Sequence, residues 1–187
     1  MNNVLVISGH PNLAQSVANQ TILQELEQAQ IKVRYLDRLY PDFQIDVAAE
    51  QAALLAADII VWQFPLHWYT LPALMKKWLD EVFVYGFAHG STGNKLQGKK
   101  LILSFTTGAA AQEYRSGGAM NFPLDAFLPP LQQTALLCGM EWQPPCYSNG
   151  MMYIAGVSGE QALQALQTHA KQHAQALIRQ IKALQSA

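Results

Sequence analysis

The stretch from Asp58 to Phe64 constrains the fold of this chain most strongly, because it is almost continuously apolar and stops at Pro65. Such a run is too short to span a membrane and is typical of a central parallel strand that helices cover on both faces. Four shorter apolar runs alternate with segments of helical period: 4–8, 31–36, 101–105 and 140–142. This alternation predicts parallel strands joined by crossover helices.

Five strands in this order predict a single α/β domain over residues 1–187. The expected architecture is a doubly wound five-stranded parallel sheet of order 2-1-3-4-5, with helices on both faces. Helices are expected after Ser16 and over 48–56, 72–83, 125–138 and 159–184. Ligands of such sheets bind beyond the carboxyl ends of the strands. We therefore expect functional residues to follow Ser8, Phe64 and Phe105.

Composition excludes several classes of protein. Half of the residues are hydrophobic and 13% are charged, which excludes a disordered chain and predicts a subunit interface. A net charge of −1, with no basic cluster larger than a lysine pair, argues against nucleic acid as a partner. The N-terminus lacks the basic region of a signal peptide, so we expect a soluble cytoplasmic protein.

Cysteine and histidine spacing gives no metal site. Cys138 and Cys146 have neither a CxxC spacing nor a nearby histidine pair, and they are expected to be ordinary thiols. His169 and His173 are four residues apart on the last predicted helix but have no acidic partner. We expect them to be exposed helical histidines rather than metal ligands.

The loop after the first strand is suited to a phosphate. It leads to a helix whose N-terminus presents free backbone N–H groups and a partial positive charge. Ser16 and Asn19 can add side-chain donors, and His10 can face the same anion. The loop has neither a GxGxxG nor a Walker pattern. Ser16 as a simple helix cap, and His10 as an ordinary loop residue, remain equally good interpretations.

Two further loops lie at the same predicted edge. Between Pro65 and Pro72 the chain holds Trp68 and Tyr69, which together would form a stiff aromatic wall for a planar ligand; filling the core is the alternative role for these aromatics. After the fourth strand, small residues that allow close backbone approach precede Tyr114, a potential proton or hydrogen-bond donor.

These loops carry a family resemblance. The segments His10-Pro11, Ser16, Asn19, Phe64–Lys76 and Thr106-Thr107-Gly108 resemble the NAD(P)H:quinone oxidoreductase (DT-diaphorase) family, which has a flavodoxin-like fold. The segments 39–46, 61–63 and 138–145 are similar to its short bacterial branch, which includes the ancillary quinone reductases of Kef potassium-efflux systems. The likeness extends from residue 1 to about residue 147.

The resemblance implies a homodimer with flavin at the interface, two-electron reduction of a quinone, and ping-pong exchange of NADH or NADPH with the quinone. Residues implied to hold the flavin phosphate or ribityl chain are His10, Ser16, Val17, Ala18 and Asn19. Residues implied to line the isoalloxazine are Pro65, Leu66, His67, Trp68, Tyr69, Thr106, Thr107, Gly108 and Ala109. Tyr114 falls at the position of the family's active-site tyrosine.

The chain departs from the larger eukaryotic members in two ways. Met120 stands where they have a histidine that partners the tyrosine, so quinone reduction here would use Tyr114, backbone donors and water. The chain is also shorter at the end that contacts the adenine half of FAD, which favours FMN, with FAD as the alternative. The Gly86–Gly98 loop, which contains His89, would either cover the site or serve only as a connection.

Two other functions stay open at this stage. An electron-carrier flavodoxin is one, although such carriers are typically acidic and this chain is nearly neutral. A regulatory flavoprotein subunit of a Kef-type system is the other, and it is compatible with quinone reduction. That partner would bring a cytoplasmic protein to the inner face of the cell membrane.

Overall fold

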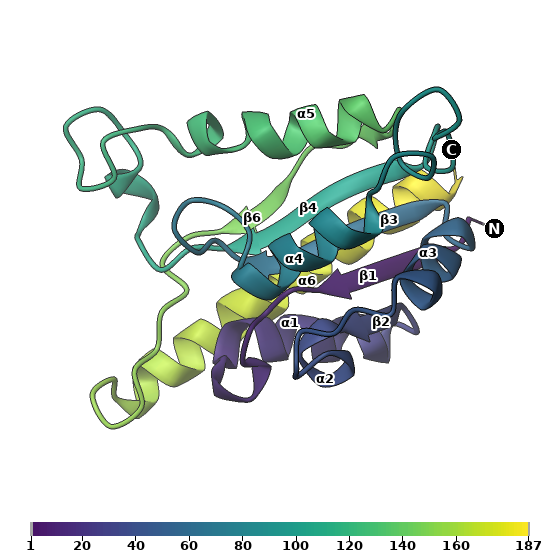
Figure 1. Ribbon diagram of the computed structural model, residues 1–187. Coiled ribbons are helices and arrows are strands. Elements are labelled where there is room, and N and C mark those ends of the chain that lie inside the picture. Colours follow the sequence, from purple (N-terminus) through teal and green to yellow (C-terminus); the bar gives the residue numbers. More distant parts are fainter. Residues whose placement is uncertain (1, 187) are drawn as a thin grey trace.

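The sheet of the computed structural model, which describes residues 2–186, has the strand order β2-β1-β3-β4-β5, and every strand pair is parallel (Figure 1). The strands are β1 (Val4–Ser8), β2 (Lys32–Tyr35), β3 (Ile59–Pro65), β4 (Lys100–Thr106), β5 (Glu141–Trp142) and β6 (Cys146–Ser148). Both β5 and β6 pair with β4, so they are two halves of one fifth strand. Pro144 and Pro145 stand at the break, where the missing N–H groups cannot join the ladder. The predicted fold class and the order 2-1-3-4-5 are confirmed.

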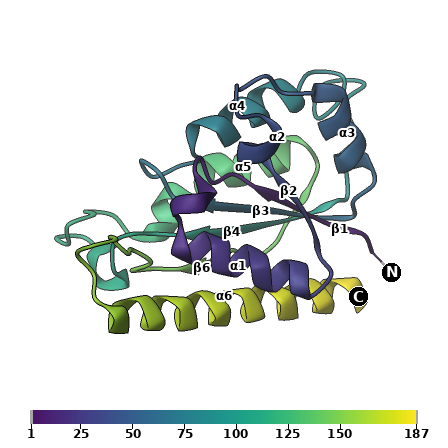
Figure 2. The same cartoon turned by 90° about the horizontal axis from the view of Figure 1, so that it is seen from below.

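Helices cover both faces of the sheet. The helices α1 (Val17–Gln28) and α6 (Glu160–Ser186) lie on one face, and α3 (Val47–Leu55), α4 (Ala73–Val82) and α5 (Pro129–Leu137) lie on the other, as Figure 2 shows. A short helix, α2 (Leu36–Leu39), directly follows β2. Single 3-10 turns stand at Leu13–Gln15, Ala111–Glu113 and Leu124–Phe127. Within residues 2–186, none of the helices combines the length and apolarity that crossing a bilayer requires.

The central strand β3 is buried on both faces, as its apolar run predicts. Ile60, Trp62 and Phe64 belong to the apolar cluster beneath α3, α4 and α5. Ile59 and Val61 belong to the cluster beneath α1 and α6. Side chains alternate between the faces of a strand, so a continuous apolar run supplies both cores at once.

Two predicted elements differ from the structure. The second strand ends at Tyr35, and Leu36 already begins α2. The predicted helix 125–138 is divided into a 3-10 turn, Leu124–Phe127, and α5. Pro129 and Pro130 begin α5, because proline lacks the N–H that an uninterrupted helix would need and fits its first turn.

The Gly86–Gly98 loop does not cover the predicted ligand edge. It leads into β4 at Lys100, and the Gly98 N–H donates to the Gly139 carbonyl beside the start of β5, at 2.9 Å. The loop therefore lies at the amino ends of the strands, opposite their carboxyl ends. Three of its side chains are buried in the core: Phe87, Ala88 and Leu96. Its role in the structure is that of a packed connection.

Candidate functional site

The loop after β1 delivers the N-terminus of α1 to the carboxyl edge of the sheet. Ser16 caps this helix, because its Oγ accepts a hydrogen bond from the Asn19 backbone N–H at 3.2 Å. Among the described residues, no acceptor pairs with the backbone N–H groups of Val17 and Ala18. Free N–H groups at a helix N-terminus carry a partial positive charge and suit an anion.

The loop after β3 contains a strained turn. His67 and Thr70 exchange two backbone hydrogen bonds, at 3.1 and 3.0 Å, around Trp68 and Tyr69. Both central residues have positive φ, 48° and 66°, which is the geometry of a type I′ turn that Asn and Gly normally occupy. For other residues this geometry costs about 1–2 kcal/mol each. Trp68 is 91% exposed, so the core-filling interpretation of this side chain is wrong.

The loop after β4 is joined to the segment that follows β6. Thr107 donates its N–H to the Ser148 carbonyl at 3.0 Å, and its own carbonyl accepts from Met151 at 2.8 Å. Gly108 lies so close to Met152 that an added Cβ would be 2.8 Å from the Met152 Cε. The segment from Ser148 to Met152 thus becomes a fourth strand-end segment of the site.

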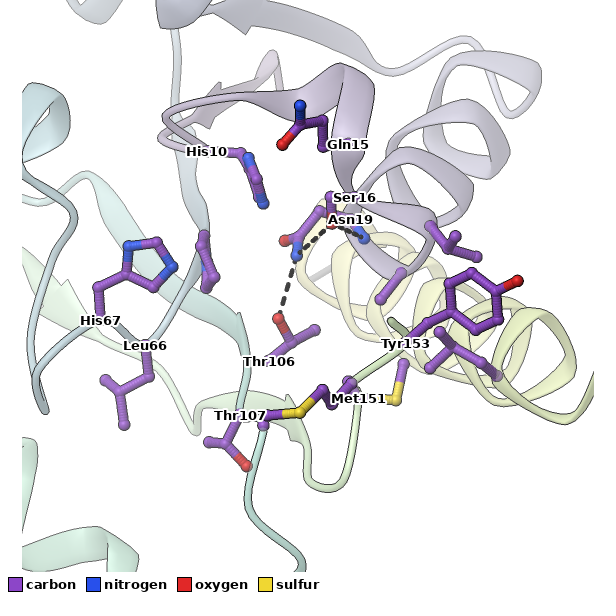
Figure 3. A pocket seen from close by; sticks show the side chains of 16 residues that line it. His10, Gln15, Ser16, Asn19, Leu66, His67, Thr106, Thr107, Met151 and Tyr153 are labelled. Atoms are coloured by element: carbon purple, nitrogen blue, oxygen red, sulfur yellow. Dashed lines mark hydrogen bonds between the residues drawn. The ribbon is translucent and has the colours of Figure 1, made fainter. Parts of the chain in front are cut away.

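These loops surround a pocket of about 450 Å³, which lies within the range of small-molecule sites (Figure 3). Predicted residues that line it are His10, Ser16, Val17, Ala18, Asn19, Pro65, Leu66, His67, Thr106, Thr107 and Gly108. Trp68, Tyr69 and Ala109 do not line it. Sequence reasoning missed Gln15, Met151, Met152, Tyr153 and Leu166.

The polar lining of the pocket consists of neutral donors and acceptors. It includes neither a carboxylate nor a lysine or arginine. Asn19 stands at its centre, where its Nδ2 donates to Ser16 Oγ at 3.3 Å and to Thr106 Oγ1 at 3.1 Å (Figure 3). A bound anion would therefore meet hydroxyl and backbone donors without a repelling charge.

Two histidines stand near each other at the rim. The rings of His10 and His67 are 6.4 Å apart and meet edge to face. Burial, followed by the neighbouring His67, lowers the pKa of His10 to about 4, and burial also lowers the pKa of His67. His10 is therefore neutral at pH 7, and its Nδ1 accepts from the Asn12 N–H at 3.1 Å. Its Nε2 then carries the ring proton and is a donor.

The predicted catalytic residue Tyr114 lies in an aromatic cluster beside the strained turn. Its ring meets Phe127 edge to face at 6.3 Å, and Tyr69 stacks on the same Phe127 at 4.8 Å. The hydroxyl of Tyr69 contacts the Sδ of Met120 at 3.9 Å. Tyr114 and Tyr69 thus share a neighbour, although neither lines the pocket.

His173 corrects one prediction from the sequence. His169 is exposed, as expected, but His173 is 3% exposed and lies under the sheet. It falls on the apolar stripe of α6 with Leu166, Ala170 and Leu177, a spacing that was sufficient to predict its burial. Cys146, whose Sγ is 3.9 Å from the ring, is a free thiol, and burial raises its pKa to about 11. Across the part of the chain that the structure describes, no three His, Cys, Asp or Glu side chains gather as a metal site would require.

Comparisons with known proteins agree with this architecture. The flavodoxin-like fold family matches residues 2–177, so the chain belongs to that family. An ancillary protein of the glutathione-regulated potassium-efflux system, KefF, from Klebsiella pneumoniae (strain 342) is 42% identical over 170 residues, which cover 90% of this chain and 93% of the relative.

Two solved structures extend the likeness. General stress protein 14 from Treponema denticola, in complex with FMN, is 35% identical with a TM-score of 0.84, over 95% of this chain and 98% of that one. An NADPH-quinone reductase from P. pentosaceus is 28% identical with a TM-score of 0.73, over 92% of this chain and 97% of that one. The chain is thus a flavodoxin-like protein similar both to quinone reductases and to Kef ancillary proteins.

Proposed function

We propose that this protein is a flavin-dependent NAD(P)H:quinone oxidoreductase whose pocket at the carboxyl edge of the sheet holds FMN. The observation that carries the proposal is the convergence of four strand-end segments on one cavity that combines anion donors with a neighbouring aromatic turn. When bound, FMN supplies the redox chemistry, taking hydride from NADH or NADPH and passing two electrons to a quinone. FAD is the alternative cofactor.

The donors of the pocket fit a phosphate monoester. The N–H groups of Val17 and Ala18 and the hydroxyl of Ser16 point to one end of the cavity as the phosphate site. His10 adds a neutral Nε2–H donor there. The lack of carboxylates in the lining favours an anion over a cation.

The opposite side of the pocket suits a planar ring. Pro65, Leu66 and His67 supply a wall, and Gly108 allows the backbone to approach closely. The strained turn holds Trp68 outward, where its indole can cover a ring or a second subunit. Strain of this kind persists where a functional geometry requires it.

We assign the proton-donor role in quinone reduction to Tyr114, whose hydroxyl can donate to the oxygen of a quinone at the mouth of the pocket. Phe127 holds the Tyr114 ring in place. Met120 contacts Tyr69 but cannot relay a proton, so water would resupply the proton to the tyrosine.

A homodimer would complete the site. Large apolar side chains are exposed beside the pocket mouth, and such a patch is typical of an interface. Its members are Trp68, Phe122, Tyr147, Met152 and Ile154. A second copy that covers them would exclude water from the ring and bury the flavin between subunits.

A second candidate function is regulation of a Kef-type potassium-efflux protein. The 42% identity to a Kef ancillary protein over most of both chains favours it. It is compatible with quinone reduction, and it would place a cytoplasmic protein at the inner face of the membrane. Co-purification with a Kef-type protein from the native host tests this partner, and its absence under conditions that preserve membrane complexes would argue against it.

The central experiment is a two-step redox titration of the purified protein. After incubation with FMN we expect a stoichiometric flavin absorption band, which NADH or NADPH bleaches anaerobically and a quinone restores. Parallel incubation with FAD identifies the cofactor, and azo and nitro compounds test the range of acceptors. A protein that retains neither flavin, or whose reduced flavin no quinone reoxidises, would contradict the proposal.

A further inference from the structure

A chain of hydrogen bonds leads from the pocket into the protein interior. Gln63 Nε2 donates to Asn19 Oδ1 at 2.9 Å, and Ser104 Oγ donates to Gln63 Oε1 at 2.5 Å. His173 follows, with its Nε2 2.8 Å from Ser104 Oγ and its Nδ1 3.0 Å from Ser148 Oγ. All five side chains are buried. These hydrogen bonds thus connect α6 to α1, whose N-terminus lines the pocket.

The network replaces part of an apolar core. Gln63 and Ser104 are register partners on β3 and β4, and they follow Val61 and Ile102, which belong to the apolar cluster under α1 and α6. Burying polar groups on that face is costly unless each is paired. Apolar residues would serve stability equally well, so the network points to a role at the site where it ends.

The hydrogen bonds of the network all run in one direction. Because Ser104 donates its single hydroxyl proton to Gln63, it must accept from His173, whose Nε2 therefore carries the ring proton. His173 Nδ1 then accepts from Ser148. Each member donates to the next, and the last donor, Asn19 Nδ2, bonds to the hydroxyl oxygens of Ser16 and Thr106 in the pocket.

This direction decides what the pocket presents to a ligand. Ser16 Oγ accepts from both the backbone N–H and the Nδ2 of Asn19, so its hydroxyl proton is left to donate elsewhere. Thr106 Oγ1 also accepts from Asn19, and its proton is likewise free. In the other tautomer of His173, the side-chain amides of the network would be reversed. The Ser16 and Thr106 hydroxyls would then donate their protons to Asn19 Oδ1. The pocket would then lose two donors.

We infer that His173 is a positioning residue whose Nε2–H tautomer orients the network, so that Ser16 and Thr106 donate into the pocket and select a ligand end made only of acceptors, a phosphate monoester. The inference rests on the proposed function for the identity of that ligand. Burial, followed by the exposed His169, lowers the pKa of His173 to about 4, which keeps the ring neutral. The nearby Cys146 is an un-ionised thiol at neutral pH. A neutral ring has one donor and one acceptor nitrogen, as the directed network requires.

The test compares FMN with riboflavin, which lacks the phosphate. We expect His173→Leu to weaken FMN binding by about tenfold, the effect of losing a hydrogen bond to a charged group, and to leave riboflavin binding within about twofold, inside the usual scatter of such measurements. His173→Gln, which keeps one donor and one acceptor, should restore FMN binding. The matched control is His169→Leu on the exposed face of α6, which should change neither affinity. Equal losses for both ligands in His173→Leu, or no rescue by His173→Gln, would overturn the inference.

A second measurement needs no variant and no flavin. Nitrogen NMR of the histidine rings in the wild-type protein should show His173 protonated at Nε2 and unprotonated at Nδ1, and the opposite tautomer would refute the inference. If the wild type bound no flavin, the proposed function would fail separately. Inorganic phosphate would then replace FMN as the probe, and phosphate binding that His173→Leu leaves unchanged would refute the inference.

Discussion

Two buried polar clusters in this protein are built from similar groups but end differently. The first surrounds Glu50, a fully buried carboxylate on α3. Arg34 pairs with both of its oxygens, the Tyr40 hydroxyl bonds to Oε1, and Trp78 Nε1 donates to Oε2 at 3.0 Å. The second is the His173 network, whose last hydroxyls face a cavity.

The difference between them separates a structural cluster from a functional one. Every acceptor site of Glu50 is used within the protein, and its partners come from β2, the end of α2 and α4. Burial, together with the bond to Glu50, raises the pKa of Tyr40 to about 12, so this hydroxyl remains a donor. The Glu50 cluster is closed and ties elements together, whereas the His173 network is open and leaves donors for a ligand.

The largest expected effect comes from breaking the closed cluster. Glu50→Ala would leave the Arg34 charge and two buried donors unpaired, and we expect the free energy of unfolding to fall by about 3–5 kcal/mol. Denaturant unfolding measures the loss. The matched control is Asp80→Ala, which removes an exposed pair with Lys76 and should cost less than about 1 kcal/mol. A loss as small as that of the control would show that Glu50 is not a structural centre.

Acid titration should separate His173 from the closed cluster. Its pKa is lowered from 6.5 to about 4 in the folded protein, so the unfolded chain binds more protons between these pH values. The contribution of the neutral His173 ring to the free energy of unfolding is therefore fully present above about pH 6.5. It falls by up to about 3 kcal/mol as the pH drops toward 4. Unfolding curves at several pH values should show a shallower decline in His173→Gln. Parallel declines in wild type and variant would mean that the ring is protonated without cost.

Relieving the strained turn should raise stability while harming the site. Trp68→Gly removes an exposed indole and places glycine at φ 48°, so we expect a gain of about 1 kcal/mol in unfolding free energy. FMN binding should weaken by about tenfold, because a stacked aromatic contact is lost. Calorimetry measures the change in stability, and flavin titration measures the change in affinity. The control Trp68→Ala removes the indole without adding the backbone freedom of glycine. Unchanged flavin affinity in both variants would show that the indole does not cover the flavin ring.

The most narrowly confined effect is expected on one half-reaction. Tyr114→Phe keeps the packing against Phe127 and removes only the hydroxyl. We expect reoxidation of the reduced flavin by a quinone to slow by about tenfold or more, as loss of a proton donor does, while reduction by NADPH stays near wild type. Stopped-flow kinetics of each half-reaction tests this. Equal slowing of both steps would remove the proposed role of the hydroxyl.

The strand pattern could be predicted from local signals, because a strand that is buried on both faces requires a continuous run of apolar residues. The Asp58–Phe64 run, the break at Pro144-Pro145 and the helix cap at Ser16 each depend on short-range chemistry. The strand order then identified the edge where His10, Pro65 and Thr106 meet. The part of the pocket from Met151 to Tyr153 was missed because the broken fifth strand hid the strand end before it.

The amino-acid sequence by itself determined the fold class, the edge of the sheet that carries the pocket and most of the side chains that line it, because hydrophobic period and turn chemistry are local properties. Only the tertiary structure decided that Gln63, Ser104 and His173 are hydrogen-bonded partners and that the loop with His89 lies at the opposite end. The three partners come from two strands and a helix far apart in the chain. The position of His173 on the apolar stripe of α6 predicts its burial, but its hydrogen-bond partners are defined only when the strands and the helix pack together.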